Sequence, residues 1–176
     1  TYAMSLTKPY YIGVFEVTQR QWERVMGDGN KPSYYTADYA TRPLEQSSYN
    51  DIRGATNSTL AVNWPATGSA VAPACFLGKL RDKTGLADFD LPTEAQWEYL
   101  CRAGTTTYYN DGLGTPSFTT SNAQINALGR YERNGGRVWN AELGKWESPL
   151  GTCGTTNGTA VVGSYTPNAW GLYDTH

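Results

Sequence analysis

The chain has 176 residues, a formal net charge of -2 and only 17% charged residues. This length fits one domain, and the low charge with 13% aromatic residues excludes an intrinsically disordered chain. Lysines and arginines are interspersed with acidic residues and form no run that could follow a phosphate backbone, which excludes nucleic acid as a partner. No apolar stretch approaches the roughly 20 residues that span a bilayer, so we expect a soluble chain without a membrane span.

The first expected elements are a strand and a capped helix. Residues 1–16 have the pattern of a strand that is entered midway, which leaves open an export signal upstream. Thr18 and Gln21 predict a capping box, because the threonine hydroxyl accepts from the N–H three residues on while the glutamine side chain reaches back to the threonine N–H. Gly27 predicts that this helix ends in the left-handed conformation.

A second helix of the same kind is expected downstream. Thr93 and Gln96 repeat the capping box, and Gly104 predicts a left-handed end. Trp22 in the first helix and Trp97 in the second are each followed by apolar residues at helical spacing. We therefore expect both tryptophans to anchor the core.

The carboxylates of the second helix do not indicate acid–base chemistry. Glu94 lies in the first turn, where the helix dipole favours a negative charge, and Glu98 is spaced to pair with Arg102 one turn later. His176 is the only histidine and the last residue, which excludes a Ser-His-Asp or Cys-His catalytic set and a histidine-rich zinc site. We assign no catalytic residue and no metal ligand from the sequence.

The glycine- and threonine-rich stretch at residues 105–166 contains one candidate ligand-binding feature. Residues 137–140 and 144–147 predict a hairpin that presents Trp139 and Trp146. Paired tryptophan rings can stack on sugars or on peptide side chains. Simple packing of the two rings within the hairpin is the alternative, and it stays open.

Three phrases resemble the successive signatures of one protein family. They are residues 16–22 (EVTQRQW), 91–99 (LPTEAQWEY) and 167–174 (PNAWGLYD), with weaker matches at residues 42–51 and 75–80. In this order they resemble formylglycine-generating enzyme domains, also called sulfatase-modifying factor domains. The resemblance covers nearly the whole chain, and residues 129–136 are similar to a loop of bacterial members, so we expect a single domain over residues 1–176.

The resemblance implies an α+β fold of the C-type lectin-like kind, with short helices, short antiparallel strands and much ordered loop. The composition agrees, since 19 glycines, 9 prolines and 13 tyrosines supply turns and large side chains that bury area without long regular elements. In the family, further signatures follow the phrase at residues 167–174, and they are missing here. We therefore expect a domain that is incomplete at its C-terminus and truncated at its start.

The activity that the resemblance implies is oxidation of a substrate cysteine to formylglycine in sulfatases. The implied partner is then a sulfatase-like protein or peptide. Members of the family bind copper through two cysteines in the C-terminal part that this chain lacks, and soft Cu(I) prefers such thiolates. We therefore expect the chain alone to be inactive, and copper only where a further segment supplies the cysteine pair.

The three cysteines of the chain are too far apart in sequence to suggest such a pair. Cys75 and Cys101 fall on expected apolar helix faces, which predicts buried structural thiols. Cys153 lies in a loop and is the thiol most expected to be exposed. The odd number of cysteines leaves at least one thiol unpaired.

A structural calcium ion is the other cofactor that the resemblance implies. Its ligands would lie near residues 121–126, where Gln124 occupies a position expected to hold an asparagine ligand. Residues 28–30 and 110–112 also place oxygen atoms beside a glycine. Both lack the spaced carboxylates of a calcium loop, so we expect turns there.

Three functional classes stay open. In the first, the whole protein oxidises a cysteine of a partner protein. In the second, the domain is a non-catalytic, lectin-like module for ligand binding or display, as scaffolds with variable loops often are. In the third, it is an accessory domain linked to a kinase or a sulfatase.

Overall fold

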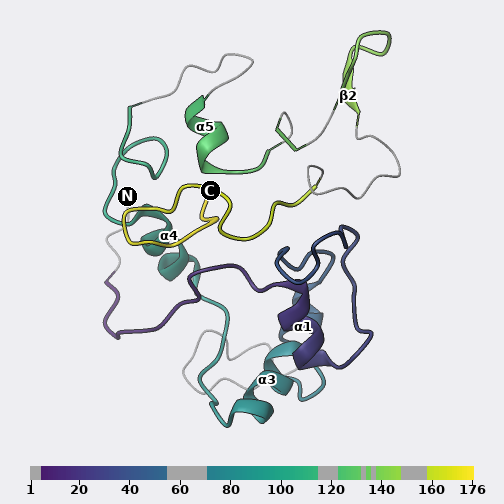
Figure 1. Cartoon of the computed structure of the whole chain (residues 1–176). Coiled ribbons are helices and arrows are strands. Elements are labelled where there is room, and N and C mark those ends of the chain that lie inside the picture. The colour runs from purple at the N-terminus through teal and green to yellow at the C-terminus, as the bar shows by residue number, and fades with distance from the viewer. Residues whose placement is uncertain (1–4, 55–70, 115–122, 132–133, 136–137, 148–157) are drawn as a thin grey trace.

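The computed structural model describes residues 5–54, 71–114, 123–131, 134–135, 138–147 and 158–176 (Figure 1). Within these ranges the chain forms five helices and one hairpin, joined by long stretches of coil. The helices are α1 (Gln19–Met26), α2 (Tyr49–Ile52), α3 (Phe76–Thr84), α4 (Glu94–Arg102) and α5 (Ala123–Leu128), and the strands are β1 (Val138–Asn140) and β2 (Lys145–Glu147). None of the described helices is both long and apolar enough to cross a bilayer.

The capping box predicted for α1 is confirmed. The Gln21 N–H donates to Thr18 Oγ1 at 3.2 Å, and the Thr18 N–H donates to Gln21 Oε1 at 2.9 Å. The helix ends at Gly27, but this glycine has φ +115° and ψ 156°, so the predicted left-handed end is wrong. Its N–H donates to Glu23 O at 2.8 Å and closes the last turn.

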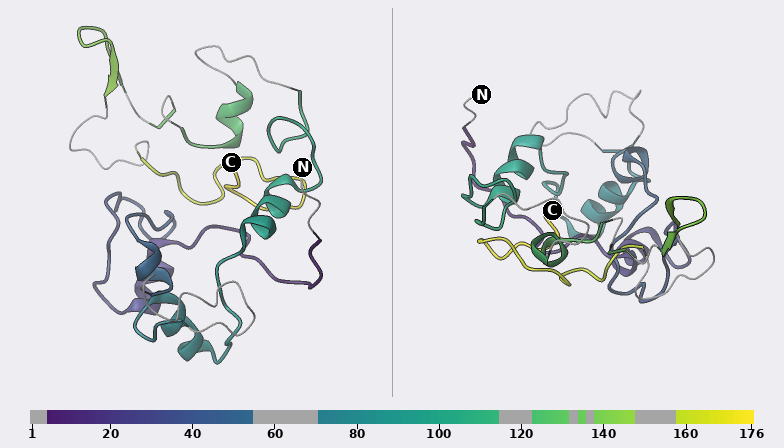
Figure 2. Two further views of the ribbon diagram at one scale, coloured as in Figure 1. Left: turned by 180° about the vertical axis from the view of Figure 1, so that it is seen from behind. Right: turned by 90° about the horizontal axis from the view of Figure 1, so that it is seen from above.

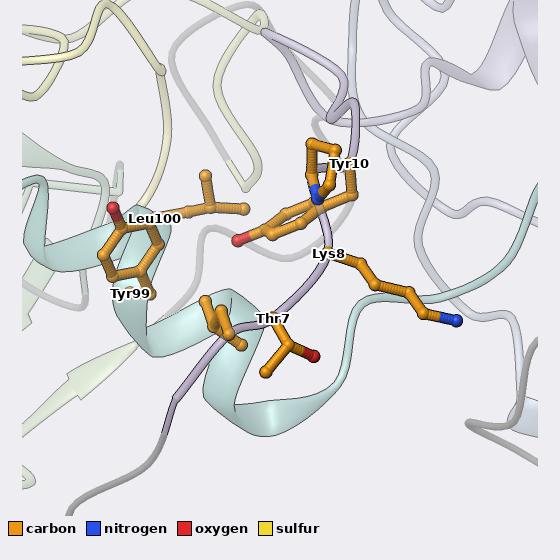
Figure 3. Close-up of a pocket in the computed structure, with 7 residues that line it drawn as sticks. Thr7, Lys8, Tyr10, Tyr99 and Leu100 are labelled. Carbon is orange, nitrogen blue, oxygen red and sulfur yellow. The ribbon is translucent and has the colours of Figure 1, made fainter.

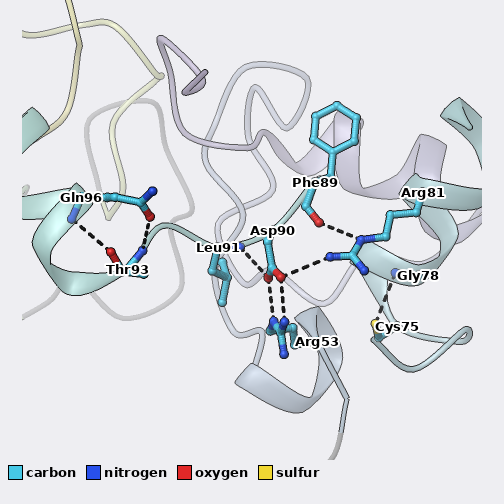
Figure 4. A network of polar contacts seen from close by, with 9 residues as sticks. All are labelled: Arg53, Cys75, Gly78, Arg81, Phe89, Asp90, Leu91, Thr93 and Gln96. Carbon is cyan, nitrogen blue, oxygen red and sulfur yellow. Dashed lines mark hydrogen bonds and ion pairs between the residues drawn. The ribbon is translucent and has the colours of Figure 1, made fainter. Parts of the chain in front are cut away.

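The same capping box begins α4, as predicted. The Gln96 N–H donates to Thr93 Oγ1 at 3.2 Å, and the Thr93 N–H donates to Gln96 Oε1 at 2.8 Å (Figure 4). After the helix, two residues adopt the left-handed conformation: Ala103 at φ +46° and Gly104 at φ +83°. The predicted end is therefore confirmed, although it begins one residue before the glycine.

The core forms where α1 meets α3. The Trp22 ring stacks on the Phe76 ring, with centroids 4.8 Å apart and planes within 3°. α1 and α3 lie side by side, and α2 contacts α3 (Figure 1, Figure 2). The segment before α3 folds closely over the helix at Gly78, where a Cβ would lie 2.2 Å from Ala72 O. The buried members of this core are Trp22, Cys75, Phe76 and Leu77.

Within the described residues, α4 packs against coil instead of against another helix. The Tyr10 hydroxyl donates to Gln96 O at 3.3 Å, which ties the N-terminal segment to the first turns. Asn168 Nδ2 donates to Leu100 O at 2.7 Å, which ties the C-terminal segment to the last turn. That C-terminal segment, yellow in Figure 1, runs beside α4.

The prediction that Trp97 anchors the core is wrong. Trp97 is 52% exposed, whereas Trp22, at the matching position of α1, is 2% exposed. The C-terminal segment meets α4 at Leu100 and Cys101, in the last turn, and leaves the earlier turn open. Helical spacing identifies an apolar face, but it does not say how far along the helix that face is covered.

The predicted α+β, C-type lectin-like fold with antiparallel strands is also wrong for the described residues. Regular strand there is limited to the three-residue strands β1 and β2, which form the predicted hairpin. The hairpin projects away from the helices (Figure 1). No sheet in the described part of the chain packs on a helix.

The early start of α1 limits strand pairing here. Two segments meet at an isolated bridge between Thr18 and Pro43. The segment that carries Thr18 turns into α1 at Gln19, so the pairing does not continue beyond this bridge in that direction. Residues 5–17 form no strand, and residues 1–4 lie outside the described residues.

The two tryptophans offer a direct test of this packing. We expect Trp22→Ala to lower the free energy of unfolding by about 3–5 kcal/mol, because it empties the centre of the core. The matched change Trp97→Ala should cost less than about 1 kcal/mol, because the ring is half exposed. Urea unfolding of both variants measures the difference. Equal losses would contradict the assignment of the core.

Candidate functional site

An open pocket of about 490 Å³ lies between α4 and the N-terminal segment (Figure 3). Its lining residues are Leu6, Thr7, Lys8, Pro9, Tyr10, Tyr99 and Leu100. The Tyr10 hydroxyl points towards Tyr99 and Leu100, and its hydrogen bond to the α4 backbone fixes the ring. The Lys8 ammonium group points away from these side chains (Figure 3). The walls of the pocket therefore combine aromatic and aliphatic side chains with the polar Thr7.

These walls are uncharged at neutral pH. Burial raises the pKa of Tyr10 above its ordinary value of 10.0, and the neighbouring Tyr99 raises this pKa further. The phenol of Tyr10 therefore keeps its proton at pH 7. Lys8 is the one charged residue among the seven lining residues, and it is directed outward. An apolar group entering the pocket would desolvate no charge.

An exposed pair of aromatic rings borders the pocket. Tyr99 and Trp170 meet edge to face, with ring centroids 4.9 Å apart and an interplanar angle of 61°. They are 53% and 45% exposed. We call Tyr99 and Trp170 the aromatic surface. Rings of this size left open to solvent commonly mark a contact site.

Asn168 holds the aromatic surface in place. Its Oδ1 accepts from the N–H groups of Trp170 and Leu172 at 3.0 and 3.1 Å, while its Nδ2 donates to Leu100 O. Asn168 is 5% exposed, and such buried amides must be satisfied on both ends. One side chain therefore shapes the turn that carries Trp170 and also fastens it to α4.

The predicted ligand-binding residues Trp139 and Trp146 lie elsewhere. The register of β1 and β2 places them directly opposite each other, so the structure brings the two residues together as predicted. They do not belong to the pocket or to the aromatic surface. Their role in ligand binding stays a prediction.

Both described cysteines are structural. Cys75 and Cys101 are free and buried, as predicted. Cys75 differs from the prediction in one respect, because it precedes α3 and caps it by accepting from the Gly78 N–H at 3.4 Å (Figure 4). Cys101 accepts from Asn110 Nδ2 at 2.6 Å and donates to Thr175 O at 2.8 Å.

The environment of these thiols does not suit copper chemistry. Burial raises the pKa of Cys101, and the nearby charge of Glu98 adds to that rise, so the thiol stays protonated. Cys75 and Cys101 are each committed to hydrogen bonds around different helices. The described residues therefore do not form the thiolate pair that Cu(I) needs. Cys153 lies outside the described residues.

The expected calcium region is also committed to other contacts. Asn126 Oδ1 accepts from the Tyr131 hydroxyl at 2.8 Å and from Asn134 Nδ2 at 3.4 Å. Gln124 Nε2 donates to Asp111 Oδ2 at 2.5 Å. No group of three or more histidine, cysteine or acidic side chains in the described ranges is placed to hold a metal ion. Residues 121–122 lie outside the described residues, and a structural calcium ion in this region stays a prediction.

The remaining polar predictions concern local structure. Arg102 Nε lies 2.8 Å from Glu98 Oε1, which confirms the predicted ion pair between neighbouring turns of α4. Residues 28–30 and 110–112 contain turns, as predicted. In the first of these, Asn30 Oδ1 accepts from the indole N–H of Trp22 at 2.8 Å and so serves the core.

A buried ion-pair network was missed by the sequence analysis. Arg53, at the end of α2, donates from Nε and Nη2 to the two carboxylate oxygens of Asp90, each at 2.6 Å (Figure 4). Arg81 Nη2 joins the same carboxylate at 3.1 Å. Arg53 and Asp90 are 37 residues apart and carry no local pattern that would have paired them.

Comparison of the whole chain decides its family. The model of the sulfatase-modifying factor enzyme 1-like domain matches residues 2–176. The chain belongs to this family. Chaperone protein LppX of Paenibacillus barcinonensis is 26% identical over 196 residues, which cover 94% of this chain and 58% of that protein. This sulfatase-modifying-factor-type chain thus spans less than two thirds of that relative's length. No solved structure is significantly similar to it.

The structural role of the thiols predicts their reactivity. In the native protein we expect iodoacetamide to alkylate Cys75 and Cys101 at least about tenfold more slowly than in denaturant, because both sulfur atoms are buried. Peptide-resolved mass spectrometry measures each thiol separately. A cysteine introduced at the exposed loop position Thr106 (Thr106→Cys) is the matched control and should react equally fast in both states. Fast native labelling of Cys75 or Cys101 would refute their structural assignment.

Proposed function

We propose that this chain is a polypeptide-binding domain of the sulfatase-modifying factor family, and that a partner protein docks on the aromatic surface and its pocket. The observation that carries this proposal is the exposed pair of Tyr99 and Trp170, held beside an open pocket by the buried amide of Asn168. Other rings of the chain, such as Tyr34 and Tyr108, are also exposed, but they do not line the pocket, so the pair of Tyr99 and Trp170 is the better candidate for a contact site.

The chemistry of the surface favours a polypeptide. Tyrosine and tryptophan rings bury a large area on contact and lose little conformational entropy, because each has only two side-chain torsions. Their polar edges remain available to backbone groups of a partner. The uncharged pocket next to them accepts an apolar side chain without desolvating an ion. The surface and the pocket together suit an apolar side chain flanked by peptide backbone.

The family and the relative support the same class of partner. The family is named for a factor that modifies sulfatases, and the relative is named as a chaperone protein. These names describe different activities, but each describes a protein that acts on another protein. Binding of a polypeptide is the step common to both, and it is the step for which this chain has a suitable surface.

The aromatic surface gives the direct test. We expect Tyr99→Ala and Trp170→Ala each to weaken binding of a permanently unfolded probe, reduced and carboxymethylated lactalbumin, by about tenfold or more, as central aromatic contacts do. Fluorescence anisotropy of the labelled probe measures the dissociation constant. Circular dichroism of each variant confirms that the helices are retained.

A matched aromatic pair controls for general stickiness. Tyr108 is 61% exposed and meets Tyr109 edge to face at 5.1 Å, away from the pocket. Tyr108→Ala should change the affinity by less than about twofold, since it removes an equally exposed ring outside the site. Equal effects of Tyr108→Ala and Tyr99→Ala would refute the proposed surface. The double change at Trp139 and Trp146 to alanine, in the same assay, tests the hairpin as a separate contact.

The second candidate function is the family's oxidation of a substrate cysteine to formylglycine. Family membership over residues 2–176 favours it for the whole protein. The described thiols, Cys75 and Cys101, contribute to helix packing and not to a copper site. A structural calcium ion is likewise a proposal carried by the family alone.

We therefore expect the 176-residue chain, supplied with copper and dioxygen, to leave a cysteine-containing sulfatase peptide unchanged. Mass spectrometry of the peptide, with hydrazide capture of any aldehyde, measures the conversion. A formylglycine-generating enzyme of known activity, under the same conditions, shows that the assay works. Aldehyde formation by this chain would contradict the proposal of a binding domain and would point to chemistry outside the described residues.

A further inference from the structure

Phe15 of the N-terminal segment packs against the C-terminal segment at two places. A Cβ at Gly163 would lie 2.6 Å from Phe15 Cε1, so the ring fills the space that a side chain at this position would need. The rings of Phe15 and Tyr173 lie with centroids 5.0 Å apart at an angle of 32°. One side chain therefore contacts two separate parts of the C-terminal segment.

The backbone around this ring is held by hydrogen bonds. The Tyr173 N–H donates to Val14 O, next to Phe15, at 3.1 Å. The Gly163 N–H donates to Asp174 Oδ2 at 2.7 Å, which brings the two parts of the C-terminal segment together. Gly163 has φ +74°, a conformation that residues with a side chain rarely adopt. The ring therefore lies against a surface that is fixed in one arrangement.

This contact completes a set of three. Tyr10 already ties the N-terminal segment to α4, and Asn168 ties the C-terminal segment to α4. The contact of Phe15 with Tyr173 joins the two segments to each other, so each of the three parts is tied to the other two. Trp170 lies between Asn168 and Tyr173 in the sequence. The turn that carries Trp170 is therefore held at both ends.

Phe15 itself lies outside the core and outside the pocket. It is 49% exposed and does not belong to the buried core around Trp22. It is also not among the residues that line the pocket. Exposed residues away from a core usually tolerate substitution well. An effect of Phe15 on the docking site would therefore act through the residues that it holds.

We infer that Phe15 is a positioning residue for the docking site, and that it sets the spacing between Trp170 and the pocket wall at residues 6–10. Because its ring fixes the C-terminal turn against the N-terminal segment, both borders of the pocket are ordered before a partner arrives. Binding to such a surface costs less conformational entropy than binding to one that must first be ordered. This role rests on the proposed function, because Phe15 affects binding through Trp170.

Hydrogen exchange of the full chain tests the hold of Phe15 without any partner. The Tyr173 amide is the reporter, because it donates to Val14 O beside the ring. In Phe15→Ala we expect the protection factor of this amide to fall by at least about threefold relative to that of the Gly85 amide, which closes α3. Phe15→Tyr keeps an aromatic ring and should retain the wild-type protection.

A double-mutant cycle shows whether Phe15 positions Trp170 or contacts the partner itself. We expect Phe15→Ala to weaken binding of the carboxymethylated lactalbumin probe by about threefold or more, and Phe15→Tyr to bind as the wild type does. In the Trp170→Ala background, Phe15→Ala should change the affinity by less than about 1.5-fold, because the ring that it positions is absent. A direct contact of Phe15 with the probe would instead give equal losses in both backgrounds.

Tyr34→Ala is the matched control for removing an exposed ring. Tyr34 is 54% exposed and meets Tyr35 edge to face at 5.1 Å, and neither residue lines the pocket. This variant should keep the wild-type protection of the Tyr173 amide and the wild-type affinity for the probe.

The inference about Phe15 and the proposed function fail in different ways. Unchanged Tyr173 protection or unchanged affinity in Phe15→Ala, or equal losses in both backgrounds, overturns the positioning role. If Trp170→Ala still weakens binding in that case, the proposed function stands. If Trp170→Ala binds the probe as the wild type does, the proposed function is refuted, and the role of Phe15 in binding is refuted with it.

Discussion

The packing of the helical core depends on one buried guanidinium group. Arg53 is 2% exposed, and a buried charge left without a partner is strongly destabilising. α2 can therefore lie on α3 only if Asp90 returns to meet Arg53, which it does with both oxygens. Asp90 also accepts from Arg81 of α3 and from the Leu91 N–H. A single carboxylate thus fixes α2, α3 and the chain that leads into α4.

The other half of the molecule replaces strands with single side-chain anchors. Asn168 satisfies two N–H groups of its own turn and a carbonyl of α4, and Thr175 O accepts a hydrogen bond from the Cys101 thiol. Backbone groups that a sheet would pair are met one at a time, which allows long coil to be ordered. Such coil has fewer cooperative backbone hydrogen bonds than packed helices have. Binding sites are often found in regions of this kind.

The sequence predicted features that are local and failed where contacts are distant. Both capping boxes were predictable, because a threonine and a glutamine three residues apart contain the whole interaction. The prediction for Trp97 was wrong because the spacing of apolar residues along a helix does not indicate how far another segment covers that helix. The strands were overestimated because the resemblance supplied them, whereas the chain turns into α1 directly after the bridge at Thr18. Of the candidate site, Tyr99 lay in a recognised phrase, but its contact with Trp170, 71 positions further along the sequence, had no local signal.

Family membership and local chemistry answer different questions about this chain. The match over residues 2–176 fixes ancestry, and a family can keep its scaffold while its members act differently. In the described residues, the cysteines cap and pack helices, and an exposed aromatic pair borders the pocket. Residues 6–10 of the N-terminal segment line the pocket, while the C-terminal segment supplies Trp170 at its border. The Tyr173 N–H donates to Val14 O and joins these two segments, so a partner that moves one of them should also affect the other.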